Sequence, residues 1–175
     1  MSRAARTVRP ALVVVLAIIA LLSGIIFVSL ETGEQGLALE RTAHKVAQDI
    51  RKTAEFSLRA RADTCTSPVN FSGYGIHFDR NKPSSYLIFA DCNGNNTYQT
   101  SDDEIINPIL LEDGVQIQSI TPTPNLSIVF VPPDPKVFIN GNSAANPGRI
   151  VLELKSKPSV TRTITINNKG RVTIE

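Results

Sequence analysis

The chain of 175 residues lacks a surplus of charge of either sign. Its 18 Lys and Arg residues are nearly balanced by 16 Asp and Glu residues, which gives a formal net charge of +2. The basic residues are scattered along the chain, and no basic patch interleaved with aromatic residues occurs. Because clustered positive charge is the electrostatic footprint of nucleic-acid recognition, the sequence argues against a nucleic-acid partner.

The sequence also lacks the common catalytic motifs. It has no G-x-S-x-G, no H-E-x-x-H and no glycine-rich loop that would cradle a phosphate. The only two histidines, His44 and His77, have no Ser or Cys partner by motif, and each is expected to be solvated or hydrogen-bonded. The three consecutive carboxylates at 102–104 suit a solvated turn better than an acid/base pair. We predict no catalytic residue and no enzymatic activity, with an anchored enzyme as the least favoured alternative.

One segment carries no charge at all. Residues 11–30 are almost entirely apolar, and 20 residues in a helix span roughly 30 Å, which is the thickness of a bilayer core. A cleaved secretion signal would have a shorter apolar stretch and a small-residue cleavage site close behind it. The sequence predicts a retained transmembrane helix rather than a cleaved signal.

The residues beside this segment predict its orientation. Arg3, Arg6 and Arg9 precede it, whereas Glu31 and Glu34 follow it. Positively charged flanks stay in the cytoplasm. We therefore expect a single-pass membrane protein with a cytoplasmic basic N-terminus at 1–10 and a C-terminal part outside the cytoplasm.

The next segment predicts an amphipathic helix. Steps of three and four residues place one apolar stripe on it, and charged residues occupy the other face. We assign residues 31–62 to a helix that continues from the transmembrane segment. The expected stripe consists of Leu39, Ala43, Val46, Ala47, Ile50, Ala54 and Leu58.

The remainder, residues 63–175, predicts an extracytoplasmic β domain. Short runs that alternate or are rich in Val, Ile and Phe are bounded by Gly, Pro, Asn or Asp, which is typical of strands and hairpins. The predicted fold class is α+β, in which an N-terminal helix packs on a mainly antiparallel β domain. The predicted strands are 74–79, 86–91, 115–120, 126–131, 136–140, 149–155, 160–167 and 170–175.

Two cysteines, Cys65 and Cys92, fall in the part expected outside the cytoplasm. An even number of cysteines in an oxidising compartment favours a disulfide. Two separate buried thiols are the alternative.

A calcium site is the best ligand hypothesis. Asp91, Asn93, Asn95 and Asp102 stand at the first, third, fifth and twelfth places of a loop, and hard oxygen ligands at alternating positions suit calcium. Asn96 occupies the sixth place, where glycine is usual, and asparagine tolerates a left-handed backbone. The alternative is a turn whose polar side chains bond to its own backbone.

The layout resembles that of type IV pilin-like proteins. "LERTAHKVAQDIRKTAEFSL" (39–58) is similar to the helix of type II secretion pseudopilins of the minor H type and of fimbrial-transport pilins. "GYGIHFD" (73–79) with "YLIFADCNGNNTY" (86–98), and "DEIINPILLEDGVQI" (103–117), resemble the β region of that group. The resemblance implies a structural subunit of a pilus or pseudopilus filament, whose partners are other pilin-like subunits and the inner membrane. It also implies that the membrane is a bacterial inner membrane and that the C-terminal part is periplasmic or extracellular. The alternative is a membrane-anchored periplasmic β domain that binds a ligand or partner without forming filaments.

The resemblance also implies how the subunit assembles. The apolar helix would form the filament axis through Leu12, Val15, Ile18, Ile19, Leu22 and Ile26. The chain departs from the family at the processing site, where Arg6 replaces the cleaved glycine and Ala11 replaces the glutamate. Either the chain is not cleaved, or it initiates or caps a filament rather than elongating it.

Overall fold

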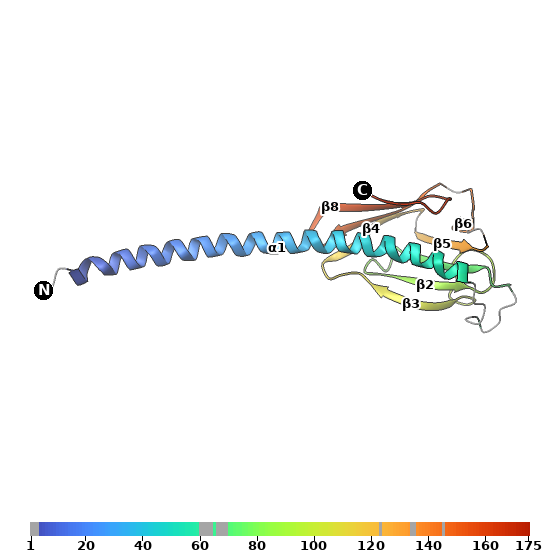
Figure 1. Cartoon of the computed structure of the whole chain (residues 1–175), viewed down its shortest axis with the longest axis horizontal. Coiled ribbons are helices and arrows are strands. Elements are labelled where there is room, and N and C mark those ends of the chain that lie inside the picture. Colours follow the sequence, from blue (N-terminus) through green and yellow to red (C-terminus); the bar gives the residue numbers. More distant parts are fainter. Residues whose placement is uncertain (1–3, 60–64, 66–69, 123, 134–135, 145) are drawn as a thin grey trace. The chain divides into compact units, whose positions relative to one another are not determined.

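A computed structural model describes residues 4–59, 65, 70–122, 124–133, 136–144 and 146–175, and leaves out the side chains of residues 4–10 and 24–33. The chain divides into two compact units, Met1–Leu37 and Ala38–Glu175. The first unit is helical wherever it is described. The helix α1 (Ala4–Arg59) continues into the second unit, which also holds all nine described strands (Figure 1).

The strands form two antiparallel sheets. The five-stranded sheet has the order β3-β2-β1-β5-β6, and the four-stranded sheet has the order β4-β7-β8-β9. The predicted α+β class with antiparallel strands is confirmed. The strands are β1 (Gly73–Asp79), β2 (Ser85–Asp91), β3 (Glu104–Leu110), β4 (Val115–Thr121), β5 (Asn125–Val131), β6 (Lys136–Ile139), β7 (Gly148–Leu154), β8 (Lys157–Ile166) and β9 (Val172–Ile174).

The core of the second unit joins the helix to both sheets. Leu39, Ala43, Val46 and Ile50 lie on one stripe of α1 and are at most 1% exposed. They pack in one cluster with apolar residues from both sheets. The amphipathic stripe predicted from the sequence is therefore confirmed over most of its length.

The stripe ends earlier than predicted. Leu58, its last predicted member, is 54% exposed, whereas Ser57 is fully buried. Ser57 Oγ accepts a hydrogen bond from the backbone N–H of Tyr74 at 2.9 Å. At the position where the stripe ends, the helix makes a polar contact with the start of β1.

One strand was not predicted. β3 contains Pro108. A proline argues against a strand in sequence analysis, because it has no N–H to donate to the hydrogen bonds between strands. The structure places β3 at the edge of its sheet, paired only with β2, where a missing N–H is tolerated. A turn at 167–170 joins β8 to β9 in an antiparallel pair, and Gly170 has a φ of 77° there.

Candidate functional site

The most unusual surface of the chain is an apolar one. Residues 11–22 of α1 are uncharged, and each of them is exposed in the isolated chain. They cover more than three helical turns, so apolar side chains surround the helix on every side. A helix with apolar side chains on all sides is normally buried, either in lipid or in protein.

The residues predicted to mediate assembly lie on this surface. Leu12, Val15, Ile18, Ile19 and Leu22 are between 50% and 56% exposed. The sixth predicted residue, Ile26, lies outside the described side chains, as do the other residues of the predicted span from 24 to 30. The assembly role of all six residues stays a prediction.

In the part of α1 that the structure describes, no stretch is both long enough and apolar enough to cross a bilayer.

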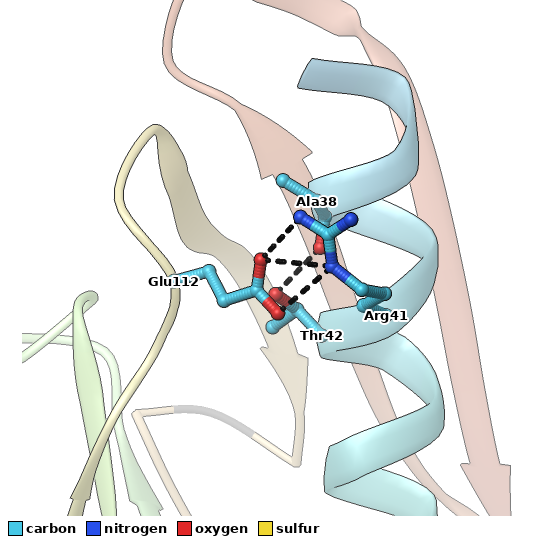
Figure 2. A network of polar contacts seen from close by, with 4 residues as sticks. All are labelled: Ala38, Arg41, Thr42 and Glu112. Carbon is cyan, nitrogen blue, oxygen red and sulfur yellow. Dashed lines mark hydrogen bonds and ion pairs between the residues drawn. The ribbon is translucent and has the colours of Figure 1, made fainter. Parts of the chain in front are cut away.

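In the second unit, an ion pair attaches the helix to the loop before β4. Arg41 donates to Glu112, with Nη2 at 3.0 Å from Oε2 and Nε at 3.3 Å from the same oxygen (Figure 2). The neighbouring Thr42 turns its hydroxyl back to the carbonyl oxygen of Ala38 at 2.7 Å, so this buried group has a partner within the helix. The ion pair is partly exposed, so it orients the helix more than it stabilises it.

A second ion pair joins the helix to the four-stranded sheet. Arg162 Nε on β8 lies 2.6 Å from Glu40 Oε2, and His44 on the next helical turn lies 3.3 Å from the other oxygen of Glu40. The hydrogen bond from Arg162 lowers the pKa of Glu40. His44 is thus a solvated partner of a carboxylate, as the sequence predicts.

The predicted disulfide between Cys65 and Cys92 is present, with a Cα–Cα distance of 5.7 Å. It sits beside a small apolar cluster in which Phe71 and Phe56 contact the ring of Tyr74. The bridge therefore fastens the segment after the helix to the end of β2.

In the loop after β2, side-chain oxygen atoms accept hydrogen bonds from backbone N–H groups of the same loop. The buried carboxylate of Asp91 accepts the N–H groups of Gly94 and Asn96, both at 2.8 Å. Asn93 and Asn95 each accept the N–H group two residues ahead, at 3.0 and 2.8 Å. Asn96 has a φ of 62°, the left-handed conformation expected from the sequence.

These bonds bear on the predicted calcium site. The fourth candidate ligand, Asp102, points an oxygen to the hydroxyl of Ser101 at 2.8 Å. Among the residues that the structure describes, no three His, Cys, Asp or Glu side chains lie close enough together to hold a metal ion. These hydrogen bonds are typical of a turn whose polar side chains bond to its own backbone. Calcium binding stays a prediction.

A buried histidine lies on the outer face of the five-stranded sheet. His77 on β1 is 8% exposed, and its Nδ1 lies 2.9 Å from Ser127 Oγ on β5. The ring of Tyr98 lies over it, with a centroid distance of 4.7 Å. Burial lowers the pKa of His77 to about 4, so the ring is neutral near pH 7. Sequence reasoning missed the Ser127 contact because strand pairing joins residues that are 50 positions apart.

Comparisons with known proteins give structural likenesses only. No protein-family model matches the chain, and no curated protein does. The minor pseudopilin EpsH from the Type 2 Secretion System of Vibrio cholerae is 12% identical over 78% of this chain and 95% of that chain, with a TM-score of 0.45. The Pseudomonas aeruginosa type IV minor pilin FimU is 9% identical over 78% and 87%, with a TM-score of 0.46.

A third solved structure is also similar. GspH of E. coli is 12% identical over 80% of this chain and 89% of that chain, with a TM-score of 0.46. EpsH and FimU are by name a pseudopilin and a pilin, the class of protein that the sequence resembles. All three TM-scores lie below 0.5.

Proposed function

We propose that this chain is a structural subunit of a type IV pilus-like or type II secretion pseudopilus filament. The observation that carries the proposal is the apolar surface of residues 11–22, which is exposed in the isolated chain on all sides of the helix. Twelve successive residues of this kind require an apolar environment, which the described part of the chain does not supply to them. Lipid before assembly and neighbouring helices after assembly would both provide it.

The chain would be held in the inner membrane before assembly. Residues 11–30 would cross the bilayer once, with Arg3, Arg6 and Arg9 on the cytoplasmic side. The second unit would then lie outside the cytoplasm. The Cys65–Cys92 disulfide supports this placement, because such bonds persist in oxidising compartments.

Assembly would exchange lipid for protein around the same helix. The partners would be other pilin-like subunits, whose apolar helices pack against residues 11–26. Since Arg6 and Ala11 replace the glycine and glutamate typical of the family that the sequence resembles, we propose a role in initiating or capping a filament.

The experiment is a deletion of residues 1–30, followed by circular dichroism and electron microscopy. The buried helix residues from Leu39 to Ile50 and both sheets share one core, so the truncated protein should fold. It should form no filaments, whereas the full chain, assembled with its partner subunits, should. If the truncated protein folds and still forms filaments, the contacts lie between β domains and the proposal fails.

A matched control separates packing from anchoring. Replacing residues 11–30 with 20 leucines keeps an apolar span of the same length but changes every side-chain shape on it. This variant should remain in the membrane and lose filaments. If the unaltered full chain gives only single particles under conditions that assemble its partner subunits, an anchored β domain without filament assembly is the correct function.

A further inference from the structure

A cavity of about 380 Å³ opens on the outer face of the five-stranded sheet, opposite the face that packs on the helix. The floor of the cavity is formed by residues that are paired across neighbouring strands. His77 on β1 is paired with Ser127 on β5 and with Leu87 on β2, and Leu87 is paired with Pro108 on β3. The lining residue of β5 is Asn125, which is paired with Asp79 on β1. Paired residues on neighbouring strands share one face of a sheet, so the cavity runs from polar at β5 and β1 to apolar at β2 and β3.

The polar end of the cavity offers both a hydrogen-bond donor and an acceptor. Ser127 Oγ already accepts the N–H of Tyr98 at 3.2 Å, so its own hydrogen is best satisfied by donating to His77 Nδ1. That bond places the imidazole proton on Nε2, for which no described residue is a partner. Asp79 Oδ1 accepts the N–H of Asn81 at 2.8 Å, and no described residue bonds to its Oδ2.

The charges that line the cavity cancel. Asp79 contributes one negative charge and Lys82 contributes one positive charge, and these are the charged side chains among the lining residues. The imidazole of His77 adds none, because burial lowers its pKa to about 4. A ligand that fits this lining is neutral and carries both donors and acceptors, together with an apolar face for Leu87, Ile105 and Pro108.

We propose that this cavity is a binding site for a neutral sugar ring. A hydroxyl group both donates and accepts, which matches His77 Nε2 and Asp79 Oδ2 at the polar end. The C–H face of a pyranose would lie over Leu87 and Pro108, beside the ring of Tyr98. The volume is that of a small-molecule site, and a buried polar group at the floor of an otherwise mixed cavity is typical of such sites.

The test uses the full chain in an amine-oxide detergent, because alkyl glucosides and maltosides carry sugar headgroups of their own. Titrations with D-glucose, D-galactose and N-acetyl-D-glucosamine are followed by amide chemical shifts in nuclear magnetic resonance. At least one sugar should shift the signals of Leu87, Tyr98 and Thr100 in a saturable manner. No saturable shift with any of the three sugars would overturn the proposal.

Two neighbouring residues provide a matched pair of variants. Ile105 lines the cavity and Ile106 does not, and they are 46% and 37% exposed, so both tolerate a longer side chain. Ile105→Arg should weaken sugar binding about tenfold or more by filling the cavity, and Ile106→Arg should leave it unchanged. Equal affinity of both variants would refute the site.

An aromatic probe gives the remaining control. If phenol saturates the same signals while the sugars do not, the cavity accepts an aromatic side chain of a partner and the sugar proposal is wrong. His77→Phe, checked for folding by its amide spectrum, should weaken sugar binding about tenfold by removing the Nε2 donor. The outcome is independent of whether the chain forms filaments.

Discussion

Tyr86 donates its phenolic O–H to Asp49 Oδ2 at 2.6 Å, and this bond connects β2 to the middle of the amphipathic helix. The tyrosine ring is 3% exposed and stacks on Phe78 with a centroid distance of 5.2 Å. Burial, reinforced by the bond to Asp49, raises the pKa of Tyr86. This charge-assisted hydrogen bond joins residues that are 37 positions apart in the sequence. It therefore helps to fix the position of the helix on the sheet.

Tyr86→Phe should lower the free energy of unfolding by about 1–3 kcal/mol, because it leaves the Asp49 carboxylate without its donor. Urea unfolding of the full chain in detergent measures the difference. The double variant Tyr86→Phe with Asp49→Leu should lose less than the sum of the two single variants, since it removes both partners at once. Strict additivity would mean that the two groups do not interact.

Replacing Cys65 and Cys92 together with serine should cost roughly 3–4 kcal/mol of unfolding free energy, since the bridge closes a loop across a sequence separation of 27. Thermal unfolding with and without a reductant measures the effect in the unaltered protein. The double serine variant should be insensitive to the reductant. Peptide mapping that found both thiols free in protein taken from the periplasm would contradict the bridge.

Acid should weaken the fold through His77. Its pKa falls from 6.5 to about 4 on folding, so between these values the unfolded chain binds more protons than the folded one. Stability is therefore lost as the pH falls from about 6.5 to about 4, by on the order of 2 kcal/mol. Burial raises the pKa of Asp91 and Asp103 above 3.8, so protonation of these two carboxyls acts in the opposite direction as the pH falls toward that value.

The contribution of His77 is isolated by a pair of histidine variants. His77→Gln should flatten the pH dependence of unfolding above pH 5, whereas His44→Gln, on the exposed face of the helix, should leave it in place. Chemical denaturation at several pH values measures both slopes. A slope that survives in His77→Gln would assign the effect to other groups.

Asp91→Ala should destabilise the protein by about 2 kcal/mol, since it removes the buried acceptor of two backbone N–H groups in a half-buried loop. We expect the loss to be the same in EDTA and in calcium chloride. A melting temperature that rises with calcium in the unaltered protein, but not in Asp91→Ala, would instead establish the predicted calcium site.

Periodic features of this fold could be predicted from the sequence, and contacts between distant segments could not. The stripe from Leu39 to Ile50 and eight of the nine described strands follow from local patterns and turn residues. β3 was missed because Pro108 argues against a strand until the strand is known to lie at an edge. The bonds from Asp49 to Tyr86 and from His77 to Ser127 depend on sheet order and register, which no local pattern of residues encodes.

Pro108 has a consequence for a protein that is present at high local concentration. An open edge strand is a template for pairing with another copy, and repeated pairing of that kind leads to amyloid-like aggregates. On β3, a proline without an N–H and a register irregularity opposite Ile88 and Phe89 interrupt that template. The strand that was hardest to predict is thereby protected against misassembly. Pro108→Val should give a protein that folds but aggregates faster on storage, with increased thioflavin fluorescence.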